Sequence, residues 1–211
     1  MTQNRWQLPH DWYAGGISSN VIVGKDVYID SSYAFAATVS TREPAVVLGD
    51  ACGVYDRASF VVGPNGFVEV GAFTCLNGTY LLCEDHIQIG SHCLLAWGVV
   101  ITDCYAYGGT PVDARRAALS AAATRPDRHL PAVTTPRPVR LEDNVWVGFD
   151  SVILPSVTLG RGCIVGCKTI IAQDVAPYTI VVGDPPRAVR TLSPDDTPEA
   201  RRLAFEELAR R

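Results

Sequence analysis

The chain has 211 residues, which is long enough for one domain with a well-buried core. A formal net charge of −4 at pH 7 and the lack of a basic block argue against a nucleic-acid-binding surface. The leading segment MTQNRWQLPHDWYAGG has no apolar run of signal-peptide or membrane-span length, so we expect a cytoplasmic protein without a membrane partner. The seven cysteines follow no disulfide or zinc spacing, which favours reduced core thiols and no bound metal.

Residues 1–20 combine aromatic side chains with a Gly15-Gly16 pair, which predicts an irregular N-terminal cap. A hydrophobic phase of six residues then begins and is interrupted by a polar loop at 31–44. Its core positions are Val23, Ile29, Leu48, Val54, Val70, Leu76 and Leu82, followed after a slip of one residue by Ile89, Leu95 and Ile101. We interpret the slip at Glu84-Asp85-His86 as a bulge, a feature that tends to re-aim side chains near a site.

The phase is unbroken from Leu141 to Val175. A large aliphatic residue recurs every six positions, and each is followed four residues later by a small or β-branched residue. The aliphatic positions are Leu141, Val147, Ile153, Leu159, Val165 and Ile171, and the small positions are Val145, Ser151, Val157, Cys163, Thr169 and Val175. This internal repeat predicts an all-β prism, in which three strand-and-turn units close one triangular coil and the coils stack like parallel strands.

The repeat stops between Cys104 and Arg137, and a stretch of this length without its own pattern is usually functional. Within it, Asp113 to Ala123 have the composition of a short helix. We therefore expect a prism domain at 21–192 with an excursion loop at 104–137. Residues 193–211 should form a C-terminal helix, since Thr197-Pro198-Glu199 is typical of a helix start.

Three features resemble the hexapeptide-repeat acyltransferases, in particular the sugar and xenobiotic O-acetyltransferases. They are the unbroken repeat, the exit DVAPYTIVVGDPPRAVR, and IGSHCLLAWGVVITD followed by an excursion that contains ARR. The resemblance covers roughly residues 21–192. It implies a left-handed parallel β-helix, a homotrimer with active sites between neighbouring subunits, and acetyl-CoA or another acyl-CoA as the acyl donor.

Family members that acetylate a hydroxyl place a general-base histidine just after the segment that matches Ile101 to Asp103, and here that histidine is missing. Tyr107 or Ala106 takes its place, and a tyrosine with the ordinary pKa of about 10 is a poor base. His86 lies about one coil earlier, where Glu84 and Asp85 would orient it and raise its pKa. The catalytic candidates are therefore His86, Tyr107 and Asp103.

The acceptor-binding candidates also come from the resemblance. Asn77 matches an asparagine that contacts the acceptor sugar in the family, although Asn77-Gly78 is also a common turn pair. The family's acceptor-orienting acid falls near Asp85. Trp97 and Tyr105 are candidates for stacking on a substrate ring, although a tryptophan in a repeat more often serves packing.

For the donor, the family uses backbone groups of the last coils and basic side chains at the exit. The matching positions are Gly148, Gly166, Cys167, Lys168, Arg187 and Arg190. We thus predict an acyltransferase that transfers an acetyl or similar group from CoA to a hydroxyl or amine of a small molecule. The alternative is a trimer whose inter-subunit cleft binds a ligand or runs a different reaction, because the family's histidine is missing.

Overall fold

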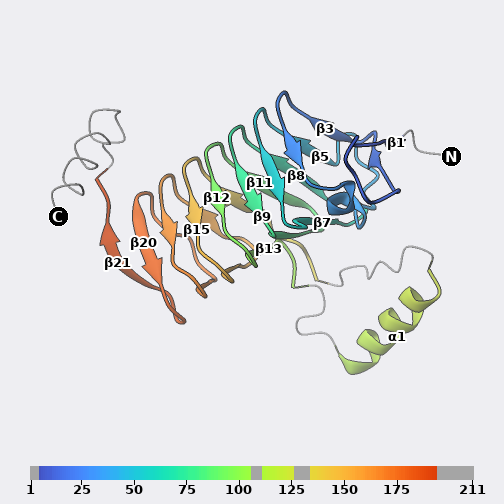
Figure 1. Cartoon of the computed structure of the whole chain (residues 1–211). Helices are drawn as coiled ribbons and strands as arrows, with labels where there is room; N and C mark the ends of the chain where they lie inside the picture. Colours follow the sequence, from blue (N-terminus) through green and yellow to red (C-terminus); the bar gives the residue numbers. More distant parts are fainter. Residues whose placement is uncertain (1–4, 106–110, 126–133, 194–211) are drawn as a thin grey trace.

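The computed structural model describes residues 5–105, 111–125 and 134–193. The chain winds into a left-handed β-helix whose coils form a three-sided prism (Figure 1). The five-stranded side contains β7 (Ser59–Val62), β10 (Tyr80–Cys83), β13 (Val100–Thr102), β16 (Val152–Ile153) and β19 (Ile170–Ile171). The six-stranded side contains β3 (Val21–Val23), β5 (Val46–Leu48), β8 (Phe67–Val70), β11 (His86–Ile89), β14 (Val139–Leu141) and β17 (Thr158–Leu159).

The third side has eight strands and continues past the last complete coil. It contains β4 (Tyr28–Ile29), β6 (Gly53–Tyr55), β9 (Cys75–Asn77), β12 (Leu94–Leu95), β15 (Trp146–Val147), β18 (Ile164–Val165), β20 (Thr179–Val182) and β21 (Arg187–Thr191). Neighbouring strands are parallel except at the end, where β21 turns back antiparallel to β20. The prism therefore closes with a hairpin at its C-terminal end (Figure 1).

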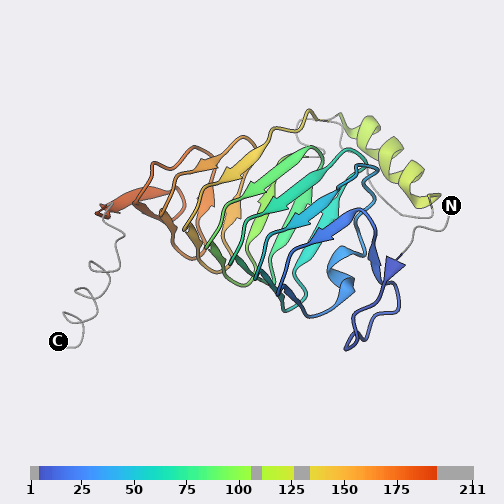
Figure 2. The same cartoon turned by 90° about the horizontal axis from the view of Figure 1, so that it is seen from above.

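The N-terminal cap precedes the first coil. It comprises the antiparallel pair β1 (Arg5–Trp6) and β2 (Ile17–Ser18). The 3-10 helix η1 (Ser32–Phe35) follows β4 and packs against β7, where Phe35 stacks on Phe60. The excursion leaves after β13 and returns at β14, and it contains α1 (Val112–Ala123), as the sequence predicts. Helix α1 stands off from the prism toward its N-terminal end and is exposed along most of its length (Figure 1, Figure 2). The predicted C-terminal helix falls almost entirely outside the described residues.

The six-residue repeat fills the prism as predicted. The six aliphatic residues from Leu141 to Ile171 are at most 1% exposed, and the small residues that follow them are buried as well. All seven cysteines are free thiols, and Cys93 and Cys163 pack in the core. Burial raises the pKa of Cys163 to about 12, so this thiol acts as an apolar filler rather than a nucleophile.

One core position was predicted wrongly. Leu81 is buried and Leu82 faces outward, so the phase has already shifted before Leu82. The cause is the tight turn at Asn77-Gly78, where Gly78 has a φ of +50° and starts the next strand one residue early. Coils in this region are also longer: Leu82 pairs with Thr102, twenty positions on, whereas Arg140 pairs with Thr158, eighteen positions on.

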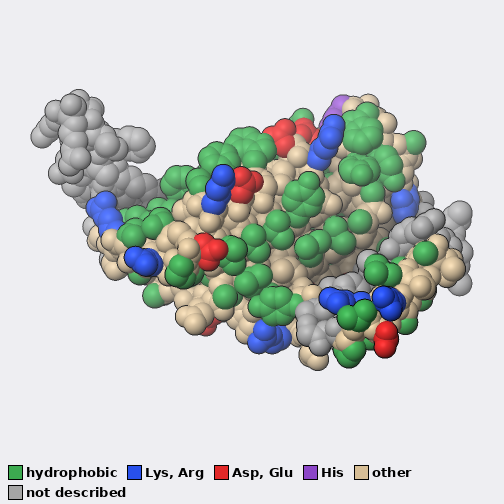
Figure 3. All heavy atoms as spheres, turned by 90° about the horizontal axis from the view of Figure 1, so that it is seen from below, with side chains coloured by type: hydrophobic (Ala, Val, Ile, Leu, Met, Phe, Trp, Pro, Cys, Tyr) green, Lys and Arg blue, Asp and Glu red, His purple; other side chains and the backbone are tan. Residues whose placement is uncertain are grey.

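The outer faces of the six-stranded and five-stranded sides differ in chemistry. The outward row on the six-stranded side is apolar at Ile22 and Val47 in the first coils. From β8 onward it is polar and contains Glu69, Gln88, Arg140 and Thr158. The outward row on the five-stranded side is mostly apolar and contains Tyr80, Val100, Val152 and Ile170. Seen from below, hydrophobic side chains form a band along the prism (Figure 3). Within the described ranges, no helix reaches the length and apolarity needed to span a membrane.

Candidate active site

The root of the excursion is organised by one buried carboxylate. Asp103 directly follows β13 and is 0% exposed. Its oxygens accept hydrogen bonds from the backbone N–H groups of Glu84, Asp85 and His86 at 2.7–3.1 Å. These three N–H groups belong to the turn where the coil carries its extra residues. Asp103 therefore accepts hydrogen bonds from donors that the ladder between parallel strands does not satisfy. Asp103 therefore holds this turn and does not face a ligand.

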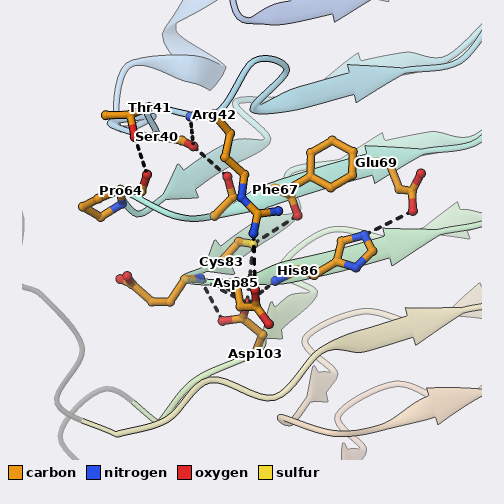
Figure 4. A network of polar contacts seen from close by, with 12 residues as sticks. Ser40, Thr41, Arg42, Pro64, Phe67, Glu69, Cys83, Asp85, His86 and Asp103 are labelled. Atoms are coloured by element: carbon orange, nitrogen blue, oxygen red, sulfur yellow. Dashed lines mark hydrogen bonds and ion pairs between the residues drawn. The ribbon is translucent and has the colours of Figure 1, made fainter.

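His86 begins β11 at this turn and points out from the six-stranded side (Figure 4). Its Nε2 lies 3.1 Å from Glu69 Oε1, and its ring stacks on Phe67 with the centroids 5.2 Å apart. The side chain is 33% exposed, so a substrate can reach it. The orienting carboxylate thus comes from Glu69 on the preceding coil and not from the adjacent Glu84 or Asp85. A histidine held by a carboxylate in this way is the usual arrangement of a general base.

Glu84 is the second ionisable group at the turn. Burial raises the pKa of its carboxyl from the ordinary 4.5 to about 7, and the nearby Asp103 charge adds to the shift. The side chain lies over Gly63 of the preceding coil, where a Cβ would collide with the carboxylate. A carboxyl that is half-ionised near neutral pH can give or take a proton.

The remaining predicted residues near this turn also lie at the root of the excursion. The Asp85 carboxylate is 3.7 Å from a guanidinium nitrogen of Arg42 (Figure 4). Tyr105 is half-exposed at the start of the excursion, where it can meet a ligand. Tyr107 lies outside the described residues. His86, Asp85, Asp103 and Tyr105 are thus brought together along the edge where the five-stranded side meets the six-stranded side, here called the excursion edge.

The other predicted acceptor residues lie on a different edge, between the eight-stranded and five-stranded sides, here called the aromatic edge. Asn77 is buried there and donates from Nδ2 to the Leu95 carbonyl at 3.1 Å, which is a structural role. Trp97 is half-exposed, donates from Nε1 to Asp56 Oδ2 at 2.6 Å, and stacks on Phe149 with the centroids 5.7 Å apart. Within one subunit, these residues do not share a cleft with His86.

The predicted donor residues extend along the same aromatic edge in the last coils. The N–H groups of Gly148 and Gly166 are already bonded to the carbonyls of Val165 and Val181, both at 2.8 Å. A Cβ at Gly148 would lie 2.8 Å from the Cys167 nitrogen, so this glycine permits close stacking of the coils. Cys167 is an exposed thiol at the same turn.

The cations predicted for the donor remain accessible. Lys168 occupies a turn position with a φ of +56°, and Arg187 and Arg190 are exposed on β21. These three side chains are the available cations for CoA phosphates at the C-terminal end of the prism. Within the described ranges, no group of three His, Cys, Asp or Glu side chains is placed to hold a metal ion.

The sequence did not predict two features of the excursion edge, the contact of Glu69 with His86 and the raised pKa of Glu84. Glu69 precedes His86 by seventeen residues, and the strand register pairs Phe67 with His86, which brings Glu69 beside the ring. The coil spacing relates Glu69 to His86. No single period fits this irregular region, so the spacing did not predict their contact. The raised pKa of Glu84 depends on burial against the preceding coil and has no local sequence signal.

The chain is similar in sequence to known proteins over its six-residue repeat. Residues 138–173 match the family model described as bacterial transferase hexapeptide (six repeats). A chloramphenicol acetyltransferase of Agrobacterium fabrum is 36% identical over 55 residues, which is 26% of this chain and 26% of that enzyme. The matched segment therefore spans about a quarter of the length of this curated relative.

Solved structures extend the likeness over most of the chain. A hexapeptide-repeat acetyltransferase of Vibrio cholerae O1 biovar eltor, solved with acetyl coenzyme A, is 26% identical with a TM-score of 0.53 over 77% of this chain and 76% of that chain. A mutant of AntD, an N-acyltransferase of Bacillus cereus, was solved with dTDP and coenzyme A. It has a TM-score of 0.55 over 93% of this chain and 88% of that chain, and at 18% identity this shows the fold alone. The resemblance to hexapeptide-repeat acyltransferases and the left-handed β-helix are thereby confirmed.

Proposed function

We propose that this protein is a CoA-dependent acyltransferase that moves an acetyl or similar acyl group to a hydroxyl or amine of a small molecule. The observation that carries the proposal is the His86–Glu69 pair at the root of the excursion, with Nε2 and Oε1 3.1 Å apart. The likeness to an acetyltransferase solved with acetyl coenzyme A supports the choice of donor.

In the proposed reaction, His86 takes the proton of the acceptor hydroxyl or amine through Nδ1, because Nε2 faces Glu69. The acceptor oxygen or nitrogen then attacks the thioester carbonyl. The tetrahedral intermediate collapses with cleavage of the C–S bond, and the departing CoA thiolate receives the proton from His86. Glu69 holds the ring in position and stabilises the imidazolium that forms during the attack.

Glu84 is the second candidate for the proton acceptor. Its carboxyl lies at the same turn, and a pKa of about 7 leaves a large ionised fraction at neutral pH. Tyr107 remains a candidate from the sequence alone. Asp103 acts as a positioning residue, since its contacts go to the N–H groups of the turn that presents Glu84 and His86.

We also propose that the protein works as a homotrimer. The excursion edge and the aromatic edge flank the five-stranded side, whose outward row is mostly apolar. If this side faces a threefold axis, the excursion edge of one subunit meets the aromatic edge of the next. Trp97 of one subunit, and the donor positions on its last coils, then face His86 and Tyr105 of its neighbour.

In this arrangement the donor lies along the aromatic edge, and Lys168, Arg187 and Arg190 hold its phosphates. We place the trimer in the cytoplasm, where its seven free thiols stay reduced. The second candidate function is binding of a ligand in the inter-subunit cleft without turnover. The observation that favours it is the lack of a histidine between Thr102 and Thr110, where the family resemblance places one.

Calorimetry with acetyl-CoA and CoA tests binding of the acyl donor and requires no known acceptor. We expect competing micromolar binding, which corresponds to about −8 kcal/mol. The absence of binding at millimolar ligand would contradict the acyltransferase proposal.

The role of His86 as general base can be tested by measuring thiol release from acetyl-CoA. The acceptors are a panel of sugars, amino sugars and chloramphenicol. His86→Ala should keep donor binding and lose transfer by about 10²-fold or more. His92→Ala is the matched control, because His92 stacks on Phe73 with the centroids 5.1 Å apart, much as His86 stacks on Phe67. Full activity in His86→Ala would rule out its role as base.

A further inference from the structure

The N-terminal end of the prism carries a pocket that the proposed reaction does not use. Its volume is about 370 Å³, within the usual range of small-molecule sites. It opens between the N-terminal cap and the first coils of the aromatic edge. The lining residues are Trp12, Asp30, Ser31, Tyr33, Ala34, Val54, Asp56, Arg57 and Ala58.

One wall of the pocket is aromatic. The rings of Trp12 and Tyr33 lie with their centroids 5.4 Å apart and their planes at 36°. Tyr13 packs edge-on against Tyr33, with a centroid distance of 5.3 Å. Trp12 is 66% exposed and Tyr33 46% exposed, so both rings keep a large apolar surface in contact with water. Such surfaces next to polar groups are typical of binding sites.

The lining also has polar side chains, which include both acceptors and a donor. Asp30 accepts a hydrogen bond from the Asp56 N–H through Oδ2 at 2.8 Å, and Asp56 accepts one from Trp97 Nε1 at 2.6 Å. These bonds fix the two carboxylates. Arg57 also lines the pocket, and its guanidinium is a hydrogen-bond donor.

The aromatic wall is held in place before any ligand arrives. The Asp11 carboxylate accepts hydrogen bonds from Ser31 Oγ at 2.7 Å, from the Ser32 N–H at 2.9 Å and from the Tyr13 N–H at 3.0 Å, and the Ser32 hydroxyl also donates to it. Burial opposes the charge, but these hydrogen bonds outweigh it and hold the pKa of Asp11 well below its usual range. The hydrogen bonds to Asp11 connect the cap segment that contains Trp12 to η1, which contains Tyr33. Ligand binding therefore costs little ordering of the walls.

We propose that this pocket binds a saccharide ring. The C–H face of a sugar stacks on an aromatic ring, while its hydroxyls donate to carboxylates and accept from a guanidinium, and the pocket presents both kinds of side chain. A ligand that is a plain cation would be attracted by Asp30 and Asp56 but repelled by Arg57, whereas a neutral polyhydroxyl compound uses all three. The pocket touches the proposed acceptor region through the Asp56–Trp97 hydrogen bond, and none of its lining residues is a proposed catalytic or donor-binding residue.

Protein-observed NMR of the tryptophan indole N–H signals tests the site on the full-length assembled protein. Methyl α-D-glucopyranoside and N-acetylglucosamine are the probes, and choline is the cationic comparison. At roughly 1–10 mM saccharide we expect the Trp12 signal to shift in a saturable way. Trp12→Ala and Tyr33→Ala should each weaken binding on the order of tenfold. Trp6→Ala, which removes an exposed indole outside the pocket, should leave it unchanged.

Three results would overturn the proposal. The first is the lack of a saturable shift at any tested saccharide concentration. The second is tighter binding of choline than of either sugar, which would make the pocket a cation site. The third is a change of sedimentation coefficient in Trp12→Ala, which would show that a neighbouring subunit covers the aromatic wall. Trp12→Phe retains an aromatic surface and should recover part of the sugar binding, which separates loss of stacking from misfolding.

Discussion

The environment of Glu84 disfavours the ionised form of its carboxyl. The carboxyl is half-buried at the excursion edge, and the Asp103 carboxylate lies nearby. Both effects favour the neutral form, so the pKa rises to about 7. A carboxyl with this property occurs in active sites more often than elsewhere, because it can exchange a proton near neutral pH.

This raised pKa makes the stability of the protein depend on pH. The folded pKa of about 7 exceeds the ordinary 4.5, so the neutral carboxyl stabilises the fold fully below pH 4.5, and this contribution is lost as the pH rises through 7. Glu84→Gln stays neutral at every pH. We expect it to exceed the wild type in unfolding free energy by about 1 kcal/mol above pH 7, a value reduced for the partial exposure of the group.

Urea unfolding between pH 4.5 and 8.5 measures this difference. It should approach zero toward pH 4.5 and reach a plateau above pH 7. Glu43→Gln, at an exposed position, serves as the control and should show no such profile. A difference that is constant across the pH range would contradict the raised pKa of Glu84.

At the scale of the element, the turn from β10 to β11 depends on a residue of the next coil. The coil is longer than the regular repeat here, and the backbone N–H groups of Glu84, Asp85 and His86 point at the Asp103 carboxylate. The backbone of the same residue closes the root of the excursion, since the Arg137 N–H donates to the Asp103 carbonyl at 2.7 Å. One residue thus fixes both the slip in the coil and the two ends of the excursion.

Asp103→Ala should therefore be strongly destabilising, because it leaves three partly buried N–H groups without their acceptor. We expect a loss of at least about 3 kcal/mol in unfolding free energy and faster hydrogen exchange at the amides of residues 84–86. Asp174→Ala is the matched control, since Asp174 is exposed and accepts one N–H, that of Thr158, at 2.7 Å. A loss no larger than that of the control would show that Asp103 does not hold the turn.

These elements also show what the sequence can predict. The register from Leu141 to Val175 follows from a strict period, because each interior position sees the same coil geometry. The slip was placed correctly at Glu84 to His86. The outward position of Leu82 was not predicted, because the turn at Gly78 shifts the six-residue hydrophobic phase by one residue before Leu82. The contact between Glu69 and His86 depends on the length of one irregular coil, which no local pattern fixes.

At the scale of the whole molecule, the six-stranded and five-stranded sides of the prism are suited to different surroundings. From β8 onward, the six-stranded side carries Glu69, Gln88 and Arg140 in one outward row and is suited to water there. The five-stranded side presents Tyr80 and Ile170 at 47% and 39% exposure in a row without charged residues. An apolar face of this extent on a β-helix is more stable when another subunit covers it.

Tyr80→Glu tests this arrangement. The row around Tyr80 offers no cation to pair with the new carboxylate, so burying it against a neighbouring subunit costs about 3 kcal/mol, or more than a hundredfold in the association constant. Sedimentation velocity should show a trimer for the wild type and smaller species for Tyr80→Glu. Phe73→Glu adds the same charge at an exposed position on the edge between the six-stranded and eight-stranded sides and should remain trimeric. Acyl transfer should fall together with the trimer fraction, because His86 and the donor positions of one subunit lie on different edges. A monomeric Tyr80→Glu with full activity would place the complete site within one chain.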